Sequence, residues 1–418
     1  MSQNNNEPKS HDPYAALRYS NYRFYIGGWF IAMLGTRIQS VAIAWEMYQR
    51  TGEPLALGLA GLIQALPAML LVLPAGYLAD RFSRRRLVMI SLGAMTLTSL
   101  SLAFLSFTEG PINVMYLLLL LDATAVTLGR PARIALVPRL VPAHDFPNAI
   151  TWNISLMQIS SVVGPALGGF ILAVNLPITY LICAISSLIF LLFLTQLKLP
   201  KYEAESEPAS WQTVLGGLTF VWQNKIILTI ISLDMFAVLL GGAVYLLPVY
   251  AQDILQVGPT GFGWLQSAPA WGALITVLLM AYLPTMQRAG RGLLLAVASF
   301  GIVTIVFGLS QNFWLSWIML FFTGVFDNIS MVVRHTLMQL LTPDRMRGRV
   351  SAVTSVFVTA SNELGGFESG LVAHWFGPVI SVVSGGIGTI VVVIVTALAS
   401  PKLVNYGALN ETPDKMTR

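Results

Sequence analysis

The feature that most limits how this 418-residue chain can fold is a series of long apolar runs separated by short polar breaks. The hydrocarbon core of a bilayer needs about 20 apolar residues per helix, and the sequence contains twelve runs of about that length. Backbone groups in lipid must be hydrogen-bonded internally, and the alternation typical of membrane barrels is absent, so we predict helices. The predicted spans are about 24–48, 55–79, 87–107, 113–136, 149–173, 177–197, 226–251, 261–284, 292–310, 313–341, 350–374 and 378–399.

The composition excludes an ordinary soluble protein. Hydrophobic residues make up 55% of the chain and charged residues 10%, whereas a soluble domain carries about 25% charged residues. The single cysteine, Cys183, lies in an apolar run, so we expect neither an intrachain disulfide nor a thiol-metal site. The polar N-terminal stretch MSQNNNEPKSHDP lacks the pattern of a cleaved signal peptide.

Basic residues gather in alternate loops, and this predicts the orientation of the chain. The loops after the second, fourth, sixth, eighth and tenth spans hold nearly all of the loop lysines and arginines, whereas the intervening loops hold little that is basic beyond Arg50. Cytoplasmic loops carry an excess of Lys and Arg. We therefore expect both termini and these basic loops to be cytoplasmic.

These signals divide the chain into five parts. We predict a polar tail at 1–21, a six-helix bundle at 22–197, a linker at 198–225, a second bundle at 226–400 and a tail at 401–418. Within the linker, the apolar stripe of WQTVLGGLTFVWQ suits a helix on the membrane surface. An extension of the seventh span is the alternative.

The two halves repeat each other. Residues 61–68 read GLIQALPA and residues 263–270 read GWLQSAPA, an offset of 202. RLVPAHD at 139–145 and QLLTPDR at 339–345 align at an offset of 201 when their prolines are matched. Duplicated six-helix halves are typical of transporters whose substrate site lies near the midplane, between the halves.

The loop sequence GYLADRFSRRRL resembles a motif of the major facilitator superfamily. Ser83 replaces the usual glycine of that motif. GPALGG resembles the fifth-helix motif that this superfamily associates with exporters, and its residues are Gly164, Pro165, Gly168 and Gly169. LGLAGLIQALPAMLLVLPAGYLADR and TPDRMRGRVSAVTS are similar to the branch that contains enterobactin exporters and macrolide efflux pumps. The resemblance covers about 17–400 and implies an all-α membrane protein of twelve helices in two bundles, in the bacterial inner membrane.

The loop motif predicts a conformational latch on the cytoplasmic side. A carboxylate at a helix end can pair with arginines or face the positive end of another helix. We expect Asp80 to hold the halves together when the passage opens outward, and a solvated loop that only sets topology is the alternative. The predicted latch residues are Gly76, Asp80, Arg81, Arg84, Arg85 and Arg133.

Ionisable residues inside the spans are the candidates for binding protons or substrate, since a charge at mid-bilayer costs at least a few kcal/mol. A buried carboxylate can take up and release protons, as antiport requires, and a buried ion pair is the alternative for each acid. Glu46 and Asp253, near the outer ends, are expected to be wetted. The candidates are Arg37, Asp122, Asp234, Asp327, Arg334, Glu363 and Glu368.

Amide and aromatic side chains are expected to line the passage, because wide aromatic surfaces suit large, partly apolar molecules. Interfacial belts are the alternative for several tryptophans. The expected lining residues are Gln64, Asn153, Tyr245, Gln266, Trp271 and Asn362. Many proton-driven facilitators carry an arginine deep in the fourth helix, where this chain has Asp122.

Together these features predict a monomeric secondary transporter that exports amphiphilic small molecules, of siderophore or macrolide type, by proton antiport and rocking of two halves. A nutrient importer and a receptor or assembly protein without flux are the alternatives. The phosphate-loop pattern GxxxxGK[ST] is absent, so ATP is not expected to drive transport. We expect no enzyme activity, no metal or other cofactor beyond the proton gradient, and no nucleic-acid partner.

Overall fold

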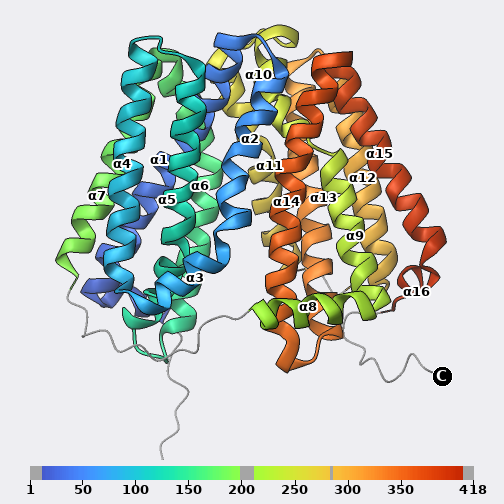
Figure 1. The fold of residues 1–418 in the computed structure, drawn as a ribbon. Helices are drawn as coiled ribbons and strands as arrows, with labels where there is room; N and C mark the ends of the chain where they lie inside the picture. Colours follow the sequence, from blue (N-terminus) through green and yellow to red (C-terminus); the bar gives the residue numbers. More distant parts are fainter. Residues whose placement is uncertain (1–11, 198–210, 283–285, 408–418) are drawn as a thin grey trace, which may run out of the picture.

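The chain folds into two bundles of long helices that lie side by side (Figure 1). The computed structural model describes residues 12–197, 211–282 and 286–407. The linker residues 198–210 and the outer parts of both predicted tails lie outside this range. The first bundle contains α1 (Ser20–Thr51), α2 (Pro54–Leu70), α3 (Val72–Arg81), α4 (Arg84–Phe107), α5 (Ile112–Ile134), α6 (Phe146–Val174) and α7 (Leu176–Gln196).

The second bundle repeats this order after the transverse helix α8 (Trp211–Gln223). A short tail helix, α16 (Pro401–Val404), follows it. Four short helical turns complete the described chain: η1 (Ala15–Arg18), η2 (Val137–Arg139), η3 (Ala243–Leu246) and the π-helix η4 (Tyr250–Ile254). The long helices are α9 (Lys225–Leu240), α11 (Gly258–Met280), α12 (Ala289–Leu309), α13 (Phe313–Leu341), α14 (Asp344–Phe376) and α15 (Pro378–Ala399), and the single turn α10 (Leu247–Val249) lies between α9 and α11.

The packing within the two bundles confirms the duplication. In the first, α4 packs against α5 and α7, and α1 packs against α6 and α7. In the second, α12 packs against α13 and α15, and α9 packs against α14 and α15. The same neighbours therefore recur when each helix of the first bundle is replaced by its repeat. Between the bundles, α6 packs against α11, and α14 packs against α2, which is the repeat-related contact.

The helices account for the twelve predicted spans. Ten of them are long and apolar enough to cross a membrane, and the bent pair formed by α2 and α3 makes an eleventh. The twelfth is α14, whose 33 residues reach about 50 Å at 1.5 Å per residue. It is more polar than the others and packs against α2, α9 and α15, so neighbouring helices shield much of it from lipid.

Two predicted spans are interrupted where glycine or proline breaks the hydrogen-bond ladder. The second span bends by 53° between α2 and α3, where Pro74 has no N–H for the carbonyl of Leu70. The seventh was predicted to be continuous, but α9 ends at Leu240 and Gly241 begins a break. The chain then passes through η3 and α10, with Pro248 in the turn, and ends in η4.

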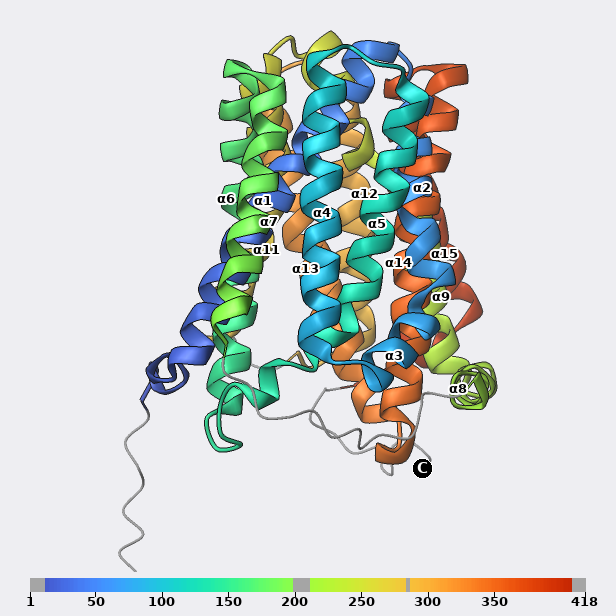
Figure 2. The same cartoon turned by 60° about the vertical axis from the view of Figure 1, so that its left-hand side comes forward.

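The predicted surface helix is present as α8. Figures 1 and 2 show α8 lying across the ends of the spans, so the alternative of an extended seventh span is wrong. The break lies at Asn224, whose side chain accepts a hydrogen bond from the N–H of Ile227 at 3.3 Å and caps α9. Trp222 is 71% exposed, as expected of a side chain that contacts lipid.

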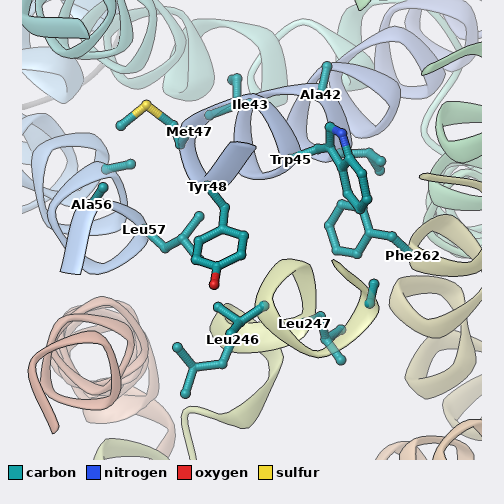
Figure 3. Packing of buried hydrophobic residues seen from close by; sticks show 14 of the residues in the cluster. Ala42, Ile43, Trp45, Met47, Tyr48, Ala56, Leu57, Leu246, Leu247 and Phe262 are labelled. Carbon is teal, nitrogen blue, oxygen red and sulfur yellow. The ribbon is translucent and has the colours of Figure 1, made fainter. Parts of the chain in front are cut away.

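Three apolar cores show how the bundles are joined. One core belongs to the first bundle alone and one to the second alone, and both lie toward the end that carries the basic loops, here called the basic end. The third core lies at the opposite end and combines residues of both bundles. Figure 3 shows part of it, with Trp45 of α1 beside Phe262 of α11, and Tyr48 next to Leu246. Within the described residues, the bundles therefore share a core only at the end opposite the basic loops, and their ribbons diverge toward the basic end (Figure 1).

Candidate functional site

Glycines bring α6 of the first bundle against α11 of the second. A Cβ atom placed on Gly169 would lie 2.8 Å from the Cα of Gly263 and 2.7 Å from the carbonyl oxygen of Pro259. A Cβ on Gly263 would lie 2.6 Å from the carbonyl oxygen of Pro165. Real side chains do not fit at these distances, so the two backbones are in direct contact. The motif GPALGG thus supplies the contact surface of this crossing.

The other glycines of this motif face α1. A Cβ on Gly164 would lie 2.4 Å from the Cβ of Arg37, and a Cβ on Gly168 would lie 3.1 Å from the side chain of Val41. The helix α6 is therefore held between α1, in its own bundle, and α11, in the other. This places the motif at the interface that closes the end opposite the basic loops.

The repeat-related crossing, of α14 on α2, is built in the same way. A Cβ on Gly58 would lie 2.9 Å from the Cα of Phe367, and a Cβ on Gly370 would lie 2.9 Å from the carbonyl oxygen of Pro54. Gly370 lies 201 residues after Gly169, so the sequence repeat places the two glycine contacts in matching positions.

Two polar contacts that the sequence did not predict join the bundles at the same end. The hydroxyl of Tyr48 on α1 donates to the carboxylate of Asp253 on η4. Glu53, before α2, lies 2.6 Å from the Nδ1 of His374 near the end of α14. The partners in each pair are more than 200 residues apart, so local sequence patterns carry no signal for them.

The break in the seventh span positions Tyr245 against a predicted acid. Tyr245 lies on η3, and its hydroxyl donates to the Oε2 of Glu363 on α14 at 3.1 Å. Gly61 of α2 lies across from both, because a Cβ on it would be 3.1 Å from that oxygen and 3.2 Å from the Cε1 of Tyr245. A carboxylate therefore lies at the junction of the two bundles, next to the glycine crossing of α2 and α14. We call Gly61, Tyr245 and Glu363 the junction site.

The other predicted lining residues differ in how much of each side chain is exposed. Gln64 and Asn362 are exposed, and each lies on the same helix as a junction residue. The Oε1 of Gln266 on α11 is buried and has no hydrogen-bond partner among the described residues. Trp271 is 36% exposed, and Asn153 on α6 is partly exposed. Which of them contact a substrate stays a prediction.

One face of α13 carries an exposed polar stripe inside a membrane span. Asp327, at the middle of the helix, is followed at four-residue steps by Met331, His335 and Gln339, and all four are exposed. Met331 is the apolar member of this stripe, and Phe322, which is also exposed, lies on the opposite side of the helix. A carboxylate facing lipid at this depth is unfavourable by at least a few kcal/mol. Asp327 instead borders a small cavity lined by residues of α9 and α12.

Two of the predicted ionisable residues form a buried ion pair. The Nη1 of Arg334 on α13 donates to the Oδ1 of Asp234 on α9, and less than a tenth of either side chain is exposed. Asp234 also borders a small cavity of about 20 Å³ that it shares with Asp327. The ion-pair alternative is therefore the one that this structure shows for Asp234 and Arg334.

The remaining candidates have polar rather than ionic partners. Thr98 on α4 donates to the Oδ1 of Asp122 at 2.6 Å, within the first bundle. Glu368 accepts a hydrogen bond from Ser369 at 3.4 Å. Arg37, in the middle of α1, is exposed, and no acidic partner for its guanidinium is found in the described part of the chain. The structure thus does not bring Arg37 and one of the acids into an ion pair.

Glu46 was expected to be in contact with water, and this expectation is wrong. It is 2% exposed, and it forms an ion pair with Arg50 at 3.2 Å. The hydroxyl of Tyr180 on α7 also donates to it at 2.7 Å. These partners replace water, so Glu46 is a buried structural group of the first bundle.

The predicted latch residues lie at the basic end, where the bundles share no core. Arg84 donates to the carbonyl of Ala135 at 3.2 Å, and Arg85 donates to that of Leu197 at 3.0 Å, so both bind helix ends within the first bundle. The guanidinium of Arg133 lies 3.5 Å from the ring centre of Trp29.

The other three latch residues, Gly76, Asp80 and Arg81, lie in α3. Arg81 donates to the hydroxyl of Tyr77 at 2.6 Å, and a Cβ on Gly76 would meet none of the described atoms within 4 Å. A latch between the bundles belongs to a conformation closed at this end, so the roles of Asp80 and its neighbours stay a prediction. Among the described residues, no group of three or more His, Cys, Asp or Glu side chains could hold a metal ion.

The comparisons with known proteins agree with this architecture. Enterobactin exporter EntS of Escherichia coli strain SMS-3-5 is 24% identical over 392 residues, which cover 93% of each chain. EntS of Shigella boydii serotype 18 gives the same identity and coverage. Among solved structures, a peptide transporter POT in complex with sulfate (TM-score 0.70, 14% identity, 91% of this chain and 94% of that one) shares the fold.

A D-xylose–proton symporter shares it as well, with a TM-score of 0.64 and 14% identity over 92% of this chain and 97% of that one. The model of a family described as transmembrane secretion effector matches residues 11–416. That match spans nearly the whole chain, including both bundles and the glycine motif of α6. The chain therefore belongs to the transmembrane secretion effector family, within the major facilitator superfamily.

Proposed function

We propose that this protein exports amphiphilic small molecules across the bacterial inner membrane by proton antiport, with the two bundles rocking about the junction site. The family description and the enterobactin exporters among its relatives support export rather than uptake. The observation that carries the mechanism is the division of the apolar cores, because the bundles share a core at one end only.

The direction of opening follows from the distribution of charge. Basic loops are cytoplasmic in membrane proteins, so the end at which the bundles diverge faces the cytoplasm. This conformation would admit a substrate from the cytoplasm while the glycine crossings close the outer end. Opening the crossings would release the substrate outside, and a contact at Asp80 would then close the cytoplasmic end. Both termini would be cytoplasmic, and the chain would act as a monomer.

The junction site is our candidate for coupling to protons. Glu363 faces both bundles and has a hydroxyl partner rather than a basic one, so it can take up a proton without breaking an ion pair. Asp234, in contrast, forms an ion pair with Arg334, which protonation of Asp234 would break. Asp327 and Asp122 are further candidates, because neither forms an ion pair in the described part of the chain.

The relatives suggest a siderophore as substrate, and a macrolide or another drug is the second class that we would test. Inverted membrane vesicles with an acidified lumen should accumulate iron-free enterobactin, and a protonophore should abolish the accumulation. Glu363→Gln keeps a hydrogen-bond acceptor for Tyr245 but cannot exchange a proton. We expect it to lose gradient-driven accumulation and to keep exchange of labelled for unlabelled substrate.

Glu109→Gln is the matched control, because Glu109 is exposed in the turn after α4 and should not alter transport. Accumulation that persists without a pH gradient would exclude proton antiport. A complete lack of exchange in the wild-type protein, with every substrate tested, would favour a receptor or assembly role instead.

A further inference from the structure

A cavity of about 260 Å³ lies between α13 and α14, toward the basic end of the second bundle. Met331, His335 and Gln339 from the stripe on α13 lie along it, and all three are exposed, so the cavity opens to the surface of the bundle. It is separate from the junction site, which lies further along α14 at Glu363. We call it the α13–α14 cavity. The proposed mechanism gives it no role.

Two arginines, Arg334 and Arg347, line this cavity together with the imidazole of His335, which offers a hydrogen-bond donor. None of the described lining residues is acidic. Arg334 is buried and has Asp234 as its partner on the α9 side, which leaves donors of the guanidinium on other sides. Arg347 has Asp344 at 2.8 Å, but the Asp344 side chain is 88% exposed, so water can easily replace that contact.

A hydroxyl in the wall of the cavity lacks a partner. Thr342 is 3% exposed, and its Oγ1 has no hydrogen-bond partner among the described residues. A buried hydroxyl without a partner is unfavourable, so an acceptor on a bound molecule would stabilise it. Ser351 also lines the cavity and carries a second hydroxyl.

The size and apolar lining limit what can bind. Pockets that enclose a whole drug-sized ligand are about 300–1,000 Å³, so this cavity is large enough for one end of such a molecule only. Met338 and Val350 supply apolar surface beside the basic groups. A carboxylate or phosphate attached to an apolar body matches this combination.

We propose that the α13–α14 cavity binds the anionic end of an amphiphile, held by Arg334, His335 and Arg347 and by the hydroxyl of Thr342. This inference rests on the proposed function in one respect, namely that the bound amphiphile is cargo entering from the cytoplasm. The cavity would then select anionic substrates before they reach the junction site.

The test uses the full chain in nanodiscs of phosphatidylcholine, with 4-fluorobenzoate as the anionic probe and 4-fluorobenzamide as its uncharged counterpart, both observed by fluorine NMR. We expect saturable binding of fluorobenzoate that is at least tenfold weaker in His335→Gln/Arg347→Gln. Arg345→Gln is the matched control, since Arg345 is exposed on the same helix and does not line the cavity. Equal binding by the double variant and the wild type would overturn the proposal.

Two further measurements separate the possible outcomes. Unfolding midpoints show whether the double variant is folded, and the single variant His335→Gln, at an exposed position, gives an independent reading if it is not. Nanodiscs with phosphatidylglycerol show whether a lipid headgroup is the occupant. Retention of this lipid by the wild type but not by the double variant, without fluorobenzoate binding, would overturn the proposal in favour of a lipid site.

The proposal and the transport function can fail separately. If vesicles accumulate enterobactin equally with the wild type and the double variant, and fluorobenzoate does not bind, export stands and the cavity proposal is wrong. If fluorobenzoate binds as expected but no tested substrate is transported, the binding site stands and export is wrong.

Discussion

Replacing Gly169 by alanine should open the outer end of the protein. In this conformation the new Cβ would lie 2.7 Å from the carbonyl oxygen of Pro259, 2.8 Å from the Cα of Gly263 and 3.0 Å from its nitrogen. All three are backbone atoms, which cannot rotate away as the end of a side chain can. The helices α6 and α11 must therefore separate by several tenths of an ångström.

The size of the effect follows from the general penalty for overpacking. Adding a methyl group to a well-packed contact destabilises it by about 1–3 kcal/mol. The contact exists only while the outer end is closed, so the penalty acts on one conformation. The equilibrium between the outer-open and outer-closed conformations should shift by about 5- to 150-fold toward the open one.

Spin labels on Gln49→Cys and Trp375→Cys measure this shift as a change in the distance between the labels, by double electron–electron resonance. The two positions are exposed, and they lie at the outer end on different bundles. The native Cys183 is 1% exposed and should remain unlabelled. Gly169→Ala should add a population with a longer distance between the labels.

Gly93→Ala is the matched control, since a Cβ at Gly93, on α4, meets nothing within 4 Å. It adds the same methyl group and the same gain in helix propensity. If Gly169→Ala and Gly93→Ala give the same distance distribution as the parent, the reasoning about the crossing is refuted.

Three further predictions concern charged groups. Asp234→Asn leaves Arg334 buried without its ionised partner, which should lower the free energy of unfolding by about 3–5 kcal/mol. Thermal unfolding in detergent measures this loss, and an unchanged midpoint would contradict the buried ion pair. Asp80→Asn should lower the transport rate about tenfold or more with membrane insertion unchanged, because a hydrogen bond to a charged group contributes ~1.5–3 kcal/mol. Full transport activity of this variant in vesicles would contradict the predicted latch. Glu53→Gln removes the partly exposed pair with His374, and such a pair contributes ~0.2–1 kcal/mol. The equilibrium between the outer-open and outer-closed conformations should therefore shift by less than about fivefold. A shift larger than that caused by Gly169→Ala would reverse our ranking of the two contacts.

The sequence predicted the bundle architecture because lipid imposes a strong and local constraint on chain segments. Helices α7, α13 and α15 begin and end within a residue or two of the predicted spans. The stripe of apolar residues after position 210 correctly indicated α8, and the repeat correctly indicated two bundles whose helices pack in the same order. The interruption of the seventh span was missed, although Gly241, Gly242 and Pro248 are the residues that cause it.

Contacts between distant residues could not be predicted in this way. The partner of Asp234 is 100 residues away, and the partner of Glu46 on α7 is 134 residues away, so nothing local marks either pair. The sequence identified Tyr245 and Glu363 separately, and only the break in the seventh span brings them together. The cavity between α13 and α14 likewise depends on how two helices pack.

The central claim is that the two ends of the protein open alternately as the bundles rock. The most direct test measures two distances in the same protein, the outer pair at positions 49 and 375 and a second pair at the exposed positions 143 and 345, at the basic end. When Gly169→Ala lengthens the outer distance, the account predicts that the basic-end distance shortens. A basic-end distance that stays constant or lengthens together with the outer one would contradict it.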